Sequence, residues 1–263
     1  MQKGIKFRIY PNREQKNLIH QTLGCCRLIY NRGLAMRKES YEEGKKIGYT
    51  QTSAMLTELK RQEEFAFLKA ADSIALQQSL RDLDRSFVNF FQKRASYPTF
   101  KSKHNRFQSY RTVNQKDNIR IVGRYIKLPK LGFVKIRQSM EVGKINHVTI
   151  EYTPAGKYFA VLNVDFEPEP RPNAGGTIGI DVGIKAFYSD SNGNTVSNPR
   201  YLERSMRKLI REQRRLSRKQ KDSHNRGKQR LRVARVHEKI ANQRNDFLQK
   251  QSTTVSYTHL TLP

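Results

Sequence analysis

The sequence has few cysteines, few acids and no long apolar segment. Its two cysteines, Cys25 and Cys26, are adjacent, so we expect neither a disulfide between them nor a four-cysteine zinc site. The six histidines are scattered without HxxxH or CxxC spacing, which disfavours zinc ligation. No apolar run approaches the roughly 18 residues that cross a membrane, and the N-terminus turns polar too early for a signal peptide. We therefore expect a reduced, cytoplasmic protein.

The charge is strongly one-sided. The chain of 263 residues carries 51 Lys and Arg against 23 Asp and Glu, a formal net charge of +28. Such a protein repels itself and attracts polyanions, so nucleic acid is the expected partner. An anionic membrane surface is the weaker alternative, because the sequence contains no lipidation signal.

The first third of the chain predicts one strand followed by helices. GIKFRIY alternates like a short strand, and apolar residues then recur at helical spacing from Arg13 to about Glu43. A second helix is expected from about Gln51 to Arg61. The third, SIALQQSLRDLDRSFVNFFQKR, places Leu and Phe on one face and Gln77, Gln78, Arg81 and Arg85 on the other. Residues 11–95 thus predict a small helical bundle.

The segment SYPTFKSKHNRFQSYRT interleaves aromatic and basic residues. Aromatic rings stack on bases while cations hold phosphates, so this pattern is typical of an RNA or single-strand surface. A solvated basic loop with aromatic anchors is the alternative. The residues predicted here to bind nucleic acid are Lys101, Lys103, Arg106, Tyr110 and Arg111.

Strands are expected from Ile119 to Phe166. Short alternating runs with Gly and Pro turns indicate a small antiparallel barrel or sheet, with a hairpin at TPAGKY. The Pro- and Gly-rich segment EPEPRPNAGG, residues 167–176, predicts a linker between domains.

The segment from 201 to 249 predicts a long polar helix interrupted near KDSHNRGK. Leu202, Met206, Leu209, Gln213 and Leu216 form its expected apolar stripe. Between residues 204 and 250 there are seventeen Lys and Arg against four acids. Ion pairs within the helix cannot neutralise such an excess of positive charge, so we favour phosphate binding over a merely solvated face. The predicted contacts are Arg214, Arg215, Arg218, Lys219, Arg226, Lys228, Arg230 and Arg232.

The stretch TIGIDVGIKAF places one acid, Asp181, between glycines in an expected strand. A strand carboxylate of this kind holds Mg²⁺ in RNase H-like nucleases, where further acids must converge on it. A G-I-D-x-G strand also opens ATPase-fold kinases, but the hydroxyl residues that contact ATP there are missing here. A strand-ending Asp in an Asx-turn is the third interpretation. The residues alone leave all three open.

An ordered set of motifs runs along residues 3 to 255. The pieces run from RIYPNREQ and LGCCRLIYN through ALQQSLRDLDRSFVNFF, YPTFKSK, YIKLPKLGFVKI and GIDVGIKAF to NPRYLERSMRKL, QRRLSRKQK and VHEKIANQRNDF. In this order they resemble the OrfB/TnpB family of insertion-sequence-encoded, RNA-guided DNA endonucleases. Each piece is modest by itself, and their order makes the resemblance specific.

The resemblance implies an α+β multidomain protein. Residues 11–95 would form a helical recognition domain like a helix-turn-helix, and residues 1–10 with 96–170 an oligonucleotide-binding-like wedge barrel. Residues 171–255 would be the first part of a RuvC, RNase H-like α/β nuclease domain. The expected location is the nucleoid-associated cytoplasm of a bacterium or archaeon.

The resemblance also implies site residues and partners. Asp181 matches the first catalytic, Mg²⁺-binding carboxylate, while Tyr49 and Gln77 match a helical face that approaches the duplex motif beside the target. Arg81 shares that predicted face. The expected partners are a guide RNA from the transposon end and target duplex DNA, with base pairing reading the target.

The sequence departs from the family pattern at its end. The second carboxylate, the CxxC–CxxC zinc module and the third catalytic acid are not found, and residues 256–263 have no family counterpart. We therefore expect a C-terminally truncated chain that binds nucleic acid without cleaving it. The alternative is a non-catalytic RNA- or DNA-binding protein, such as a repressor-like remnant.

Overall fold

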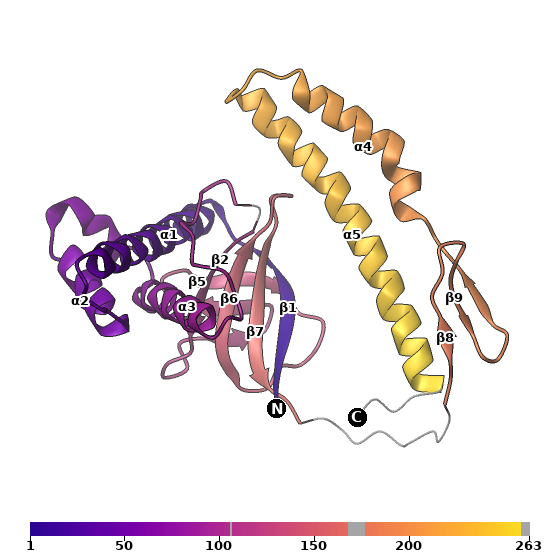
Figure 1. Ribbon diagram of the computed structural model, residues 1–263, viewed down its shortest axis with the longest axis horizontal. Coiled ribbons are helices and arrows are strands. Elements are labelled where there is room, and N and C mark those ends of the chain that lie inside the picture. The colour runs from indigo at the N-terminus through magenta and orange to yellow at the C-terminus, as the bar shows by residue number, and fades with distance from the viewer. Residues whose placement is uncertain (106, 168–176, 259–263) are drawn as a thin grey trace. The chain divides into compact units, whose positions relative to one another are not determined.

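The chain forms two compact units, which divide after Glu167 (Figure 1). The computed structural model describes residues 1–105, 107–167 and 177–258. The expected linker lies outside the described residues from 168 to 176, and so does the tail from residue 259. None of the helices described has the length and apolarity to cross a membrane.

The helices of the first unit lie where the periodicity predicts them. They are α1 (Arg13–Glu42), α2 (Tyr49–Leu59) and α3 (Ser73–Phe91), with a short 3₁₀ segment at Glu63–Lys69 between the last two. Asn12 and Gln15 form a reciprocal capping box at the start of α1. On α3 the inward Leu76, Leu80 and Leu83 are fully buried. The expected Phe stripe ends early, because Phe91 in the last turn is 74% exposed.

A seven-stranded antiparallel sheet completes this unit. Its strands are β1 (Gln2–Tyr10), β2 (Gln108–Val113), β3 (Arg120–Val122), β4 (Tyr125–Leu128), β5 (Gly132–Arg137), β6 (Ile145–Tyr152) and β7 (Tyr158–Asp165). Their order is β2-β6-β7-β1-β5-β4-β3, and the expected hairpin at TPAGKY joins β6 to β7.

The sheet curls so that its two edges meet at Asn114. Its Nδ2 donates to the carbonyl of Ile119, and its Oδ1 accepts from the Ile119 amide. One side chain thus takes the place of a strand pair between the end of β2 and the start of β3. The sequence predicts a small barrel or sheet. In the described part of the chain it forms a curled sheet whose edge strands, β2 and β3, are linked by the Asn114 side chain.

Helices and sheet share one core. Phe7 and Ile9 of β1, Ile19 and Ile29 of α1, and Leu80 of α3 belong to the same buried cluster. Burying a side chain of this size contributes about 1.5–3 kcal/mol. The two regions expected as separate recognition and wedge domains therefore lie in one compact unit. Cys25 and Cys26 are free and buried in this core, and burial raises the pKa of each thiol.

His147 makes the stability of the first unit depend on pH. It lies half-buried on β6, and desolvation together with nearby Arg111 lowers its pKa below the ordinary 6.5. The contribution of neutral His147 to the free energy of unfolding is fully present above pH 6.5. It is lost as the pH falls from 6.5 towards the folded-state pKa, because the unfolded chain binds the proton more readily. One such proton gives a slope of at most about 1.4 kcal/mol per pH unit.

We expect His147→Gln to flatten this slope. Urea unfolding followed by circular dichroism at pH 7.5, 6.5 and 5.5 would measure it. His104→Gln, at an exposed loop position, is the matched control. Because desolvation also lowers the pKa of His20, part of the slope should persist. Equal slopes in the wild type and in His147→Gln would contradict the assignment.

The second unit pairs a small sheet with two helices. Strands β8 (Ile180–Asp181), β9 (Ala186–Asp190) and β10 (Thr195–Ser197) form an antiparallel meander, followed by α4 (Tyr201–Ser217) and α5 (His224–Thr258). The break between α4 and α5 lies where the sequence predicts it. The strand expected over 177–183 is shortened to two residues, and α5 runs three residues into the segment expected as a separate tail.

Candidate nucleic-acid interface

Three residues predicted near target DNA come together on one exposed surface of the first unit. Gln77 and Arg81 lie one turn apart on the outward face of α3, and both are exposed. The Arg81 guanidinium lies 4.9 Å from the centre of the Tyr49 ring at the start of α2. Such a cation–π contact holds the guanidinium in place while leaving its N–H groups available. The surface offers an amide, a guanidinium and a phenol to a partner.

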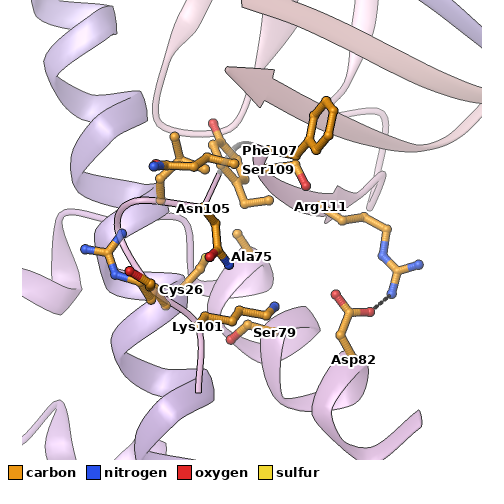
Figure 2. A pocket seen from close by; sticks show the side chains of 14 residues that line it. Cys26, Ala75, Ser79, Asp82, Lys101, Asn105, Phe107, Ser109 and Arg111 are labelled. Carbon is orange, nitrogen blue, oxygen red and sulfur yellow. Dashed lines mark hydrogen bonds and ion pairs between the residues drawn. The ribbon is translucent and has the colours of Figure 1, made fainter. Parts of the chain in front are cut away.

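The basic segment that follows α3 closes over a cavity of about 270 Å³ (Figure 2). Asn31 of α1 anchors this segment, since its side chain donates to the Lys101 carbonyl and accepts from the Lys101 amide at 2.9 and 2.8 Å. The Lys101 ammonium lies 4.0 Å from the Tyr30 ring centre, and desolvation lowers its pKa. Lys103 is exposed. Arg106 lies outside the described residues.

The structure places two of the predicted residues of this segment differently from the expectation, because the end of the segment is a strand. In β2 the side chains alternate, so Tyr110 points inward and is only 7% exposed, where no base can stack on its ring. Arg111 donates to Asp82 at 2.7 Å (Figure 2). It also donates to Gln78 at 3.1 Å. Its guanidinium ties β2 to α3, and Asp82 offsets the charge predicted to hold phosphate.

Most of the predicted cations on α4 and α5 are exposed. These are Arg214, Arg215, Arg218, Lys219, Lys228, Arg230 and Arg232. Arg226 is the exception. Its Nη1 donates to the carbonyls of Leu216 and Lys219 at 3.0 and 2.9 Å, so it caps the end of α4. Arg226 therefore has a structural role, which uses one of the nitrogens that the predicted phosphate contact would offer.

The interface between α4 and α5 has an apolar core with a buried polar pair beside it. Leu209, Val236 and Ile240 form its core, flanked by Leu202 and Val233. The predicted stripe contains Gln213, but that residue is exposed, and Glu212 is buried in its place. The buried and half-buried positions of α4 follow a 3-4-3-4 spacing from Leu202. This spacing places residue 212, and not residue 213, against α5. Met206 likewise lies outside this stripe, at 37% exposure.

Glu212 is held by contacts from both helices. The Gln229 amide of α5 donates to the Glu212 carboxylate at 2.7 Å and to its backbone carbonyl at 3.1 Å. Arg215 donates to the same carboxylate at 3.1 Å. The hydrogen bond from Gln229, followed by Arg215, Arg211 and Arg232, lowers the pKa of Glu212. A buried, partnered carboxylate of this kind fixes the register of two helices.

We expect Glu212→Ala to destabilise the α4–α5 pair, because it removes the carboxylate that accepts from the buried Gln229 amide and leaves that amide only the backbone carbonyl of residue 212. Gln213→Ala, one residue away and exposed, should have little effect. The double change Glu212→Leu and Gln229→Leu should recover stability, since it replaces both polar partners with apolar groups. Hydrogen exchange of α4 amides would measure each effect. Equal protection in Glu212→Ala and Gln213→Ala would contradict the buried pair.

Asp181 is exposed on the short strand β8. It lies opposite Ser189 in the register with β9, and the neighbouring Gly179 amide donates to Ser191 at 3.2 Å. Asp190 on β9 accepts from the amides of Asn192 and Asn194, so it organises the hairpin turn. Across the residues that the structure describes, no three His, Cys, Asp or Glu side chains converge as metal ligands would. Asp181 offers a suitable oxygen ligand but no complete magnesium site.

Some residues at these surfaces were not predicted. Arg27 of α1 and Asn105 line the cavity beside Lys101. Nothing in the local sequence singles them out, because their role depends on how the 101–109 segment packs against α1. Asn31 could have been found only by its pairing with Lys101, 70 residues away.

Comparison with known proteins places the chain in a family. A family model described as "Probable transposase", OrfB_IS605, matches residues 147–262, and its helix-turn-helix model matches residues 1–46. The first match includes residues 256–262, so the expectation that this tail has no family counterpart is wrong. The chain is 38% identical over 257 residues to a "Putative RNA-guided DNA endonuclease" of Streptomyces pristinaespiralis, and 36% identical over 262 residues to one named InsQ of Escherichia coli K12. These alignments cover 96% and 97% of this chain.

The chain spans 64% of the length of each of these two relatives. Among solved structures, a CRISPR-Cas12f ternary complex aligns with 94% of this chain and 61% of its own, at 12% identity and a TM-score of 0.36. That score is too low to assign a fold. The two family models and the two relatives agree with the motif order in the sequence: the chain belongs to the OrfB/TnpB family of transposon-encoded proteins.

Proposed function

We propose that the chain binds a guide RNA and target duplex DNA as part of a transposon-associated RNA-guided DNA endonuclease. One observation carries this proposal: the cations of residues 204–250, on α4 and α5, outnumber the acids of the same segment by seventeen to four. Glu212, one of the four acids, is already used inside the helix pair. The remaining positive charge favours binding of an external polyanion. Nucleic-acid phosphate suits this role, because each phosphate contact releases counterions and so favours binding. The names of the two relatives support RNA and DNA as the partners.

The exposed group on α2 and α3 suits duplex DNA beside the target. Gln77 and Arg81 have the side chains that hydrogen-bond adenine and guanine edges in the major groove. The Arg81 guanidinium lies over the Tyr49 ring, which supports it. We propose that this surface reads the short motif next to the target, while base pairing with a guide RNA from the transposon end reads the target itself.

We propose that Asp181 is a magnesium ligand in the family's nuclease site. Its exposed carboxylate is the hard oxygen donor that Mg²⁺ prefers. Cleavage of a phosphodiester by this chemistry requires additional carboxylates around the metal. Because the described residues do not supply them, we propose that the 263-residue chain binds nucleic acid without cutting it.

The purified chain tests both parts of the proposal. We expect it to co-purify with one structured RNA species, to bind duplex DNA in its presence, and to leave that DNA uncut with Mg²⁺. Asp181→Asn should not change RNA binding. A random RNA population would favour the non-catalytic, generic basic binder. Guided cutting that Asp181→Asn abolishes would show that the chain holds a complete site.

A further inference from the structure

The outward surface of strands β1, β5, β4 and β3 carries aromatic and basic side chains in register. We call this surface the outer β-face. Tyr10 of β1 lies opposite Lys135 of β5, and Lys135 lies opposite Tyr125 of β4. Tyr125 in turn lies opposite Val122 of β3. Directly opposed residues point to the same side of a sheet. Four neighbouring strands therefore place two tyrosines and a lysine in one row.

Two further rows continue the pattern. Phe133 lies opposite Lys127, which lies opposite Arg120, and Arg8 lies opposite Arg137. The alternate residues of these strands are the buried Ile9, Val134, Ile136 and Ile126. The core thus fixes which side chains face outward, and the outer β-face consists of Arg8, Tyr10, Arg120, Val122, Tyr125, Lys127, Phe133, Lys135 and Arg137.

The aromatic rings of this surface are open to solvent. Tyr10, Tyr125 and Phe133 are 48%, 47% and 51% exposed. Tyr10 and Tyr125 are separated by one strand, so their backbones lie about 10 Å apart, while Tyr125 and Phe133 are diagonal neighbours at about 7–8 Å. Such rings contribute little to the core and are spaced so that each can stack a separate base.

The charge of the outer β-face has one sign. Arg8, Arg120, Lys127, Lys135 and Arg137 are five of its nine residues, and none of the nine is acidic. The Arg8 guanidinium lies 5.5 Å from the Tyr10 ring centre and 5.3 Å from that of Phe159 on β7. These aromatic neighbours hold a cation beside Tyr10 without neutralising it.

A hollow opens at the same place. Its volume is about 880 Å³, and its lining includes Tyr10, Arg124, Lys135, Arg137 and Gln138 together with one acid, Glu141. Binding sites for small organic groups span roughly 300–1,000 Å³, so this hollow has room for a base that leaves the stack at Tyr10. Gln138 and Arg137 at its wall are hydrogen-bonding side chains suited to a base edge.

We propose that the outer β-face binds an unpaired stretch of RNA, with bases stacked on Tyr10, Tyr125 and Phe133 and phosphates held by Lys127, Lys135 and Arg137. Open aromatic rings interleaved with cations on a sheet are the surface that splayed single-stranded bases use. A double helix hides the faces of its bases, so it cannot use these rings. The choice of RNA over DNA rests on the proposed function, whereas the unpaired state of the strand follows from the surface itself.

Alanine substitution of the exposed rings tests this proposal in the full chain. We expect Tyr125→Ala with Phe133→Ala to weaken binding of a labelled, unstructured 12-nucleotide RNA by at least about 20-fold in fluorescence anisotropy, because each stacked base is worth at least about fivefold. The matched control is Tyr41→Ala with Phe91→Ala, two rings of the helices that are 73% and 74% exposed. Binding of duplex RNA of the same length should not change in either variant.

Three outcomes would overturn the proposal. They are equal losses for the test and control variants, an equal loss for single-stranded and duplex RNA, and tighter ring-dependent binding of single-stranded DNA than of RNA. Ultraviolet crosslinking of bound RNA, followed by mass spectrometry, should place crosslinks on peptides containing Tyr10, Tyr125 or Phe133. If the chain binds RNA and the crosslinks lie only elsewhere, the assignment of RNA binding to the outer β-face is wrong, while the proposed function stands. If it binds no RNA at all, the proposed function fails as well.

Discussion

Changing four exposed cations of α4 and α5 to glutamine is expected to weaken RNA binding about 100-fold or more at 0.15 M salt. The four are Arg214, Arg218, Lys228 and Arg230, all exposed at or near the ends of the two helices that the 218–223 connection joins. Each phosphate contact releases about 0.7–0.9 counterion, so four contacts account for a salt slope of about 3. Gln has nearly the helix propensity of Arg and Lys, so the helices should persist.

The measurement is the RNA dissociation constant at four salt concentrations. The wild type and the variant should differ both in affinity and in slope, and the two affinities should converge at high salt. A control with Lys45, Lys46, Arg61 and Lys69 changed to glutamine removes the same charge from exposed positions of the first unit. If both variants lose affinity equally, the net charge of the protein, and not the α4–α5 surface, attracts the RNA.

Helices were the part of the fold that the sequence predicted best. In α3 the apolar positions recur every three to four residues, and Leu76, Leu80 and Leu83 are all fully buried. Periodicity is a local property, so a single chain reveals it. The strand β2 was missed because its residues lie in a segment rich in Lys, Arg and Ser, and only its pairing with β6 makes it a strand. That pairing joins residues about 40 positions apart.

The candidate site was predicted in its chemistry more than in its geometry. Exposed cations on α4 and α5 follow from composition, whereas the capping role of Arg226 depends on where α4 ends. Tyr110 was assigned to stacking because aromatic and basic residues alternate around it, and the same alternation in a strand buries it. The outer β-face shows the reverse case. YIKL and GFVKIR each alternate outward polar or aromatic residues with buried ones, but only the strand order places them side by side.

Leu80→Ala is expected to destabilise the first unit by about 2–5 kcal/mol, the usual cost of truncating a fully buried leucine. Leu80 is 0% exposed and lies in the cluster shared by helices and sheet. It faces Gly33 of α1, where an added Cβ would lie 2.9 Å from Leu80 Cδ2 and 3.0 Å from Leu83 Cδ2. The lack of a side chain at Gly33 is therefore what lets α1 and α3 approach so closely.

This contact predicts a change of sign in a double-mutant cycle. In the wild type, Gly33→Ala should destabilise the first unit, because the new methyl group displaces two packed leucines. The cost of that displacement outweighs the roughly 1 kcal/mol by which Ala is favoured over Gly inside a helix. In the Leu80→Ala background the same change should stabilise, because the methyl group then enters the cavity that Leu80 leaves. Hydrogen exchange of α1 and α3 amides in the full chain would report both effects. Additive effects would show that α1 moves to relieve the contact, since coupling between touching side chains is what makes such cycles depart from additivity.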